Sequence, residues 1–188
     1  MQTIKFIAQT NSPDDSHRLI TAMFGKNPVL FLNNYGNFIA QTDAKPDLDN
    51  EFVKKHNVEI REYDTVFEPT QGETVQFNVK FCALTKAYER NPESWKLIKN
   101  QKPKNGMMLG NKEEAKEWLK FILEKHGAIE ININMDLTEC WENRKKQKII
   151  VHSASGYVKI SESDKFISLL RNGIGDSKYL GLGLVIAQ

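Results

Sequence analysis

The sequence has few of the residues that build metal sites and disulfide frameworks. Its 188 residues include only two cysteines and four histidines, and none of them stands at zinc-ligand or HExxH spacing. One isolated pair of cysteines does not make a disulfide framework either. We therefore expect a protein in a reducing compartment, with no bound metal and no other cofactor.

Long apolar runs are also missing. No stretch of the sequence approaches the ~20 apolar residues that are needed to span a bilayer. The first residues enter a strand-like alternation at once, without the apolar region of a signal peptide. These absences predict a cytoplasmic protein that has no contact with a membrane.

A strong net charge is absent too, but the charges are unevenly distributed. Residues 1–68 carry seven Lys and Arg against ten Asp and Glu, whereas residues 69–188 carry 19 against 14. The two parts therefore have net charges of −3 and +5. A polyanionic partner would be expected to meet the second part, although the overall charge of +2 is too small to indicate nucleic acid by itself.

What the sequence does contain is a similar order of elements in its two parts, each of which begins with a strand and a helix and ends with a helix and a strand. The first run is a strand, a helix, a hairpin, a weak helix and a strand, at residues 3–8, 13–24, 28–42, 47–56 and 58–67. A linker of turn-forming residues follows at 68–72. The second run is a strand, a helix, a strand, a hairpin, a helix and a strand, at residues 75–81, 113–125, 128–135, 146–160, 162–171 and 182–187. We predict an α+β fold of two tandem ferredoxin-like (RRM-like) βαββαβ domains, over residues 1–68 and 73–188.

The last eighteen residues form a glycine-rich loop between a helix and a strand. Because P-loop and Rossmann glycines follow a strand and precede a helix, this loop is neither of these motifs. Two interpretations remain open. The loop either caps the helix and turns into the last strand, or it directs backbone N–H groups toward an anion while Lys178 adds a positive charge. Its glycines are Gly173, Gly175, Gly181 and Gly183.

Among the four histidines, His17 has the most unusual position. His56 and His126 lie at predicted helix ends and His152 lies in a predicted strand, so structural roles are expected for these three. His17 lies in the first helix at the edge of its apolar stripe and precedes Arg18. A structural role and a role in proton transfer are both open for it.

Four positive charges gather within five residues beside the predicted hairpin, at Arg144, Lys145, Lys146 and Lys148. On a ribbon they could enter a nucleic-acid groove and contact phosphates. Alternatively, they form a solvated turn that keeps a sheet edge from pairing with another chain. The sequence leaves both interpretations open.

The terminal pattern G-I-G-x-x-K-x-x-G-x-G-L resembles the glycine-rich loop of the repeat-associated (RAMP) proteins of CRISPR systems. The chain is most similar to the CasE family, endoribonucleases that cut precursor CRISPR RNA in type I-E systems. A long strand, then Asn91-Pro92, a basic segment and the helix with Trp118-Leu119 also match that family, so the resemblance covers nearly the whole chain.

This resemblance implies metal-independent RNA cleavage by attack of a 2′-hydroxyl, which leaves a 2′,3′-cyclic phosphate and a 5′-hydroxyl. His17 falls on the place of the family's catalytic histidine, with Lys178 or Arg18 as its electrostatic partner. The implied partners are the CRISPR repeat stem-loop, in the precursor and in the product, and the other subunits of the Cascade complex. The residues expected to bind RNA are Arg18, Arg90, Arg144, Lys145, Lys146, Lys148, Gly173, Gly175, Lys178, Gly181 and Gly183.

Two positions depart from the family pattern. Asp14 stands where many members have a tyrosine, and Glu89, followed by Arg90, stands where they have an arginine. A carboxylate near the scissile phosphate would repel it, so either another group assists His17 or Asp14 faces away. Two other functions remain open: a non-cleaving RNA-binding subunit with the same paired domains, and a two-domain scaffold that binds no RNA.

Overall fold

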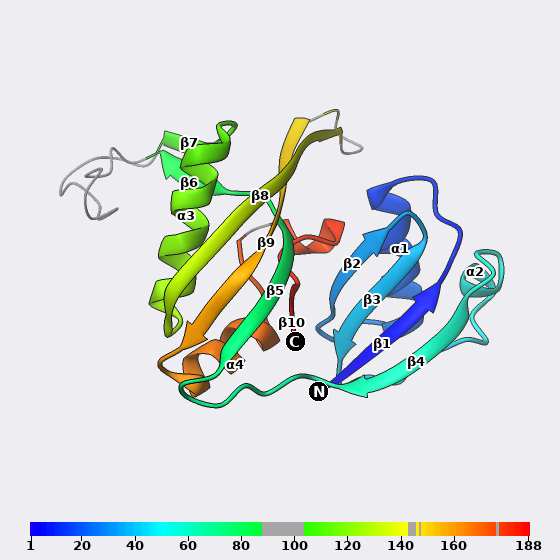
Figure 1. The fold of residues 1–188 in the computed structure, drawn as a ribbon. Coiled ribbons are helices and arrows are strands. Elements are labelled where there is room, and N and C mark those ends of the chain that lie inside the picture. Colours follow the sequence, from blue (N-terminus) through cyan, green and yellow to red (C-terminus); the bar gives the residue numbers. More distant parts are fainter. Residues whose placement is uncertain (88–103, 143–145, 147, 176) are drawn as a thin grey trace.

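The chain folds into two domains that lie side by side (Figure 1). This computed structural model describes residues 1–87, 104–142, 146, 148–175 and 177–188. Each domain contains a four-stranded antiparallel sheet, with strand order β2-β3-β1-β4 in the first and β10-β5-β9-β8 in the second. Both orders are those of a βαββαβ ferredoxin-like unit, so the predicted fold is confirmed.

The N-terminal domain follows its local sequence signals closely. Its elements are β1 (Gln2–Ile7), α1 (Pro13–Phe24), β2 (Leu30–Asn34), β3 (Asn37–Thr42), α2 (Glu51–Lys54) and β4 (Glu59–Thr65). Helix α1 begins after Ser12, whose hydroxyl accepts a hydrogen bond from the Asp15 N–H, and ends at Gly25. The apolar side of α1 packs on the sheet through Leu19, Ile20, Met23 and Phe24.

Helix α2 is shorter than the sequence suggested. It has a single turn instead of the expected span 47–56, because the Asp47 N–H donates to the Met23 carbonyl at the end of α1. That bond holds the chain in a loop until Asn50, whose side chain caps α2 by accepting from the Phe52 N–H. The weak helical pattern was therefore overridden by a tertiary contact.

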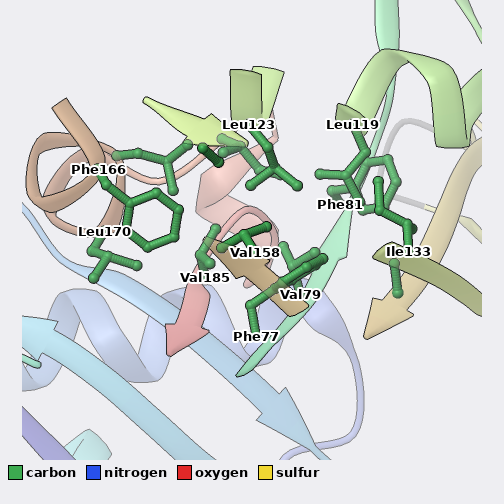
Figure 2. Packing of buried hydrophobic residues seen from close by; sticks show 14 of the residues in the cluster. Phe77, Val79, Phe81, Leu119, Leu123, Ile133, Val158, Phe166, Leu170 and Val185 are labelled. Atoms are coloured by element: carbon green, nitrogen blue, oxygen red, sulfur yellow. The ribbon is translucent and has the colours of Figure 1, made fainter. Parts of the chain in front are cut away.

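The C-terminal domain buries the alternating side chains of its first strand beneath two helices. Its elements are β5 (Thr74–Phe81), β6 (Leu84–Ala87), β7 (Lys104–Met108), α3 (Lys112–Lys125), β8 (Ala128–Glu142), β9 (Lys148–Ile160), α4 (Ser163–Asn172), the 3-10 turn η1 (Lys178–Leu180) and β10 (Val185–Ala187). In β5, Val75, Phe77, Val79 and Phe81 all point into this core. Figure 2 shows Phe77, Val79 and Phe81 in one cluster with Leu119 and Leu123 of α3 and Phe166 of α4.

The expected hairpin over residues 146–160 is wrong. Strand β9 is continuous from Lys148 to Ile160 and pairs along its length with β8, so the hairpin turn joins β8 to β9. Gly156 lies inside the strand because β8 approaches it closely. A Cβ atom at this position would stand 1.9 Å from the Asn132 carbonyl oxygen, where the pairing register shifts.

The segment after α4 lies between the two domains (Figure 1). Turn η1 contacts α1 and β2 of the N-terminal domain, and the Phe31 ring packs against Gly181. The last strand begins at Val185, later than expected, because the Gly183 N–H donates to the Lys80 carbonyl and its own carbonyl accepts from Ile174. An ion pair between Arg171 and Glu68 also ties α4 to the connection between the domains.

Within the ranges given above, no helix has the length and apolarity to cross a membrane.

Candidate active site

His17 and Tyr179 meet where the glycine-rich loop reaches the N-terminal domain. His17 is half-buried on α1, and its ring centre lies 5.8 Å from that of Tyr179. The two planes are inclined by 80° in a T-shaped contact. The Tyr179 side chain remains 46% exposed, so this pair of rings borders open solvent.

The imidazole of His17 differs from the other three in its hydrogen bonding. Among the residues that the structure describes, no group is hydrogen-bonded to the ring of His17, whose carbonyl accepts from Thr21 Oγ1. The three other histidines each direct a ring nitrogen to a carbonyl oxygen 2.8 Å away, namely His56 to Phe52, His126 to Ile122 and His152 to Leu109. These contacts agree with the structural roles expected for them.

The glycine-rich loop uses much of its own backbone for folding. The N–H groups of Gly173, Gly181 and Gly183 donate to the carbonyls of Leu169, Lys178 and Lys80. Three of the four glycine N–H donors therefore already have protein acceptors, and Lys178 is the cationic side chain of the loop. Its ammonium Nζ lies 2.7 Å from the Asn172 carbonyl oxygen and is accessible to solvent.

On its other side, His17 borders a pocket of about 380 Å³. The pocket is lined by α1 and by Phe52 of α2. The Arg18 guanidinium lies over the Phe52 ring, 4.7 Å from the ring centre. A cation that stacks on an aromatic ring in this way leaves its opposite face open to a second flat group.

A larger cleft of about 760 Å³ connects α1 to the β8–β9 hairpin. Ser16, the neighbour of His17, lines one side, and Trp141 lines the other. Lys80 contributes a cation, with Nζ 5.9 Å from the centre of the Tyr35 ring, and Glu139 and Glu142 contribute carboxylates. The charges of the cleft are therefore mixed.

The predicted basic residues are only partly visible. Lys146 and Lys148 are exposed at the β8–β9 turn, and Lys148 stands opposite Glu142 in the register of the two strands. Arg90, Arg144 and Lys145 lie outside the described residues.

The sequence did not single out Tyr179 or Phe52 as members of the site. Tyr179 stands next to Lys178 in the glycine-rich loop, which was the only local signal for it. Phe52 resembles any apolar residue of a short helix. In the described part of the chain, no group of three or more His, Cys, Asp and Glu side chains could hold a metal ion.

A family model described as CRISPR associated protein matches residues 3–187. The chain superposes on the CRISPR endoribonuclease Cse3 bound to a 19-nucleotide RNA with a TM-score of 0.78, at 17% identity, covering 100% of this chain and 97% of that chain. For Thermus thermophilus Cse3 bound to an RNA representing a pre-cleavage complex, the TM-score is 0.77 at 16% identity, with 100% of both chains covered. For a chain of a CRISPR RNA-guided surveillance complex, the TM-score is 0.69 at 14% identity, and the match covers 100% of this chain and 99% of that chain. These structural similarities establish a shared fold. A search of curated proteins found no match to the sequence.

Proposed function

The chain belongs to the CRISPR associated protein family, and from this premise we propose that it is an endoribonuclease that cuts CRISPR repeat stem-loops in precursor RNA. The similarity of its fold to RNA-bound Cse3 supports this choice among the activities of such a family. The proposed RNA meets the C-terminal domain, which carries the net positive charge. The enzyme would act in the cytoplasm and need no metal ion.

The observation that carries the proposal is the state of the His17 ring. It is half-buried on the wall of the pocket of about 380 Å³, and no described group is hydrogen-bonded to its nitrogens. A neutral imidazole nitrogen that is not engaged in this way is available to take the proton of a substrate hydroxyl. The ring nitrogens that bind carbonyls in His56, His126 and His152 are already committed to folding.

In the proposed reaction His17 takes the proton of the 2′-hydroxyl beside the scissile phosphate. The 2′ oxygen attacks phosphorus in line, and the bond from phosphorus to the 5′ oxygen of the next nucleotide breaks. The imidazolium then returns the proton to that leaving oxygen. The products are a 2′,3′-cyclic phosphate and a 5′-hydroxyl, and positioned acid–base catalysis of this kind contributes roughly 10²–10⁴-fold to the rate. Since DNA has no 2′-hydroxyl, only RNA is cut.

Cations near His17 would stabilise the additional negative charge at phosphorus. Lys178, from the glycine-rich loop that contacts α1, and Arg18, the neighbour of His17, are the candidates. We propose that the stem of the RNA is held at a greater distance by its phosphates. The residues assigned to this binding are Arg90, Arg144, Lys145, Lys146 and Lys148, with Gly173, Gly175, Gly181 and Gly183 shaping the loop that presents Lys178.

The proposed partners are the repeat stem-loop, as precursor and as cut product, and the other subunits of a CRISPR RNA-guided surveillance complex. The proposal that subunits of such a complex are partners rests on the structural match to a chain of one. A protein that remains bound to its product would deliver that RNA to the assembly.

One observation favours a second candidate, a subunit that binds RNA without cutting it. Both cations that could assist His17 have protein partners, since Lys178 Nζ is bonded to the Asn172 carbonyl and Arg18 stacks on Phe52. If these contacts persist when RNA binds, charge stabilisation at phosphorus would be weak.

Incubation of the protein with an end-labelled repeat stem-loop RNA in EDTA distinguishes the two candidates. We expect cleavage at one position, blocked when the nucleotide 5′ of the cut carries 2′-deoxyribose. His17→Ala should lower the single-turnover rate by at least ~10²-fold with little change in RNA affinity, whereas the matched control His126→Ala should cut normally. RNA that is bound but intact would establish the non-cleaving subunit, and normal cleavage by His17→Ala on bound RNA would refute the mechanism.

A further inference from the structure

We infer that Tyr179 is a positioning residue, whose aromatic ring sets the orientation of the His17 imidazole for proton transfer. This inference rests on the proposed function. It starts from the T-shaped contact, in which the ring centres are 5.8 Å apart and the planes are inclined by 80°. Edge-to-face packing of this kind is a preferred arrangement of aromatic rings and favours a particular relative orientation.

The first argument is that His17 has little else to orient it. A buried histidine such as His152 is fixed by two hydrogen bonds, one between Nδ1 and the Thr138 hydroxyl and one between Nε2 and the Leu109 carbonyl. The ring of His17 has no such bond to any described residue, so packing must restrict its rotation. A ring contact leaves both nitrogens open to the substrate, whereas a hydrogen bond would occupy one of them.

The second argument is that both sequence neighbours of Tyr179 have contacts that fix their positions. On one side, the ammonium of Lys178 is bonded to the Asn172 carbonyl. On the other side, Leu180 is only 3% exposed and belongs to an apolar cluster with Cys82, Ile149, Val151 and Leu182. Tyr179 is left projecting from η1 toward α1, because the residues that flank it are anchored in the C-terminal domain.

Orientation matters here because proton transfer needs the imidazole nitrogen within hydrogen-bond reach of the 2′-hydroxyl. An imidazole that rotates freely spends only part of its time in that geometry, and the rate falls accordingly. The contact uses the ring of Tyr179, not its hydroxyl. Phenylalanine should therefore replace it, and an aliphatic residue should not.

The test compares Tyr179→Phe and Tyr179→Leu in single-turnover cleavage of the repeat RNA at saturating protein. Tyr179→Leu is expected to lose ~10-fold in rate at unchanged RNA affinity, and Tyr179→Phe should stay within ~2-fold of the original protein. Tyr63→Leu is the matched control, since Tyr63 is 55% exposed, on β4, and makes no ring contact with His17 among the described residues. A normal rate for Tyr179→Leu overturns the inference. An equal loss in Tyr179→Phe also overturns it, because the hydroxyl would then be the active group.

A second measurement does not depend on cleavage. The ring protons of His17, assigned by their loss in His17→Ala, should shift in the NMR spectrum of Tyr179→Leu, while those of His126 should not. In Tyr179→Phe they should keep the shift that an adjacent ring current produces. Unchanged His17 signals in Tyr179→Leu overturn the positioning role even if the protein cuts RNA. A shift in a protein that cuts nothing would leave the ring contact established and reject the proposed function.

Discussion

Replacing Gly183 by alanine should destabilise the protein much more than replacing Gly72 by alanine, although the two glycines have similar φ angles. Their φ angles are +82° and +87°, in the region that side chains disfavour. The difference lies in the surroundings. A Cβ atom on Gly183 would stand 2.1 Å from the Ile174 carbonyl oxygen, whereas one on Gly72 would meet nothing within 4 Å.

The expected magnitudes follow from this geometry. Both substitutions incur the cost of a side chain at positive φ, about 1–2 kcal/mol. Gly183→Ala adds an overpacking cost of roughly 1–3 kcal/mol, because the obstructing atom belongs to the backbone and cannot rotate away. It also strains the bonds from Gly183 to Lys80 (2.7 Å) and from Ile174 to Gly183 (2.8 Å), each worth about 1 kcal/mol. If both bonds are lost we expect a total of about 4–7 kcal/mol, a large part of the ~5–15 kcal/mol that stabilises a typical domain.

Urea unfolding followed by circular dichroism measures both variants under the same conditions. The free energy of unfolding of Gly183→Ala should fall at least ~2 kcal/mol below that of Gly72→Ala. A difference under ~0.5 kcal/mol would show that the loop relaxes around a methyl group, and the argument from close packing would fail. Loss of cleavage in Gly183→Ala would not by itself assign Gly183 a contact with RNA.

Two further variants address the RNA contacts directly. Changing Arg144, Lys145, Lys146 and Lys148 together to alanine should weaken stem-loop binding and lower the slope of log K against log salt by roughly one for each lost phosphate contact. An unchanged slope would mean that these four residues form a solvated turn. The double variant Lys120→Ala and Lys125→Ala on α3 is the control for the loss of positive charge elsewhere on the protein. Lys178→Ala should change the free energy of unfolding by no more than about 1 kcal/mol, the worth of one exposed hydrogen bond, and slow cleavage. Unaltered cleavage and unaltered melting would together exclude an RNA role for Lys178.

Elements with local signals at both ends could be predicted from the sequence. Helix α1 begins and ends where Ser12, Pro13 and Gly25 place it. The alternation in β5 likewise predicted which side chains face the core. In both cases neighbouring residues carry the information, through capping bonds or through the two-residue period of a strand.

The errors occur where distant segments decide the structure. The hairpin predicted over residues 146–160 is a single strand, in which Gly156 is required by the approach of the β8 backbone at Asn132. Helix α2 lacks the first turn that was predicted, because the Asp47 N–H donates to the Met23 carbonyl of α1. Neither contact leaves a local trace, since each depends on how two elements dock.

The same distinction applies to the candidate site. His17 could be picked out by its place on the first helix and by the family resemblance. Its contact with Tyr179 could not, because it arises only when η1 packs against α1. Phe52 was equally hidden, since its stacking with Arg18 joins two helices.

The position of the glycine-rich loop between the domains also sets the order in which the molecule is assembled during translation. The N-terminal sheet is built from residues 2–65, so it can form early on the ribosome, with His17 already in place. Tyr179 is added 162 residues after His17, a delay of about 8–32 s at typical rates of synthesis. During that interval the contact between His17 and Tyr179 does not exist, so the RNA cleavage proposed above would have to wait until the glycine-rich loop is made.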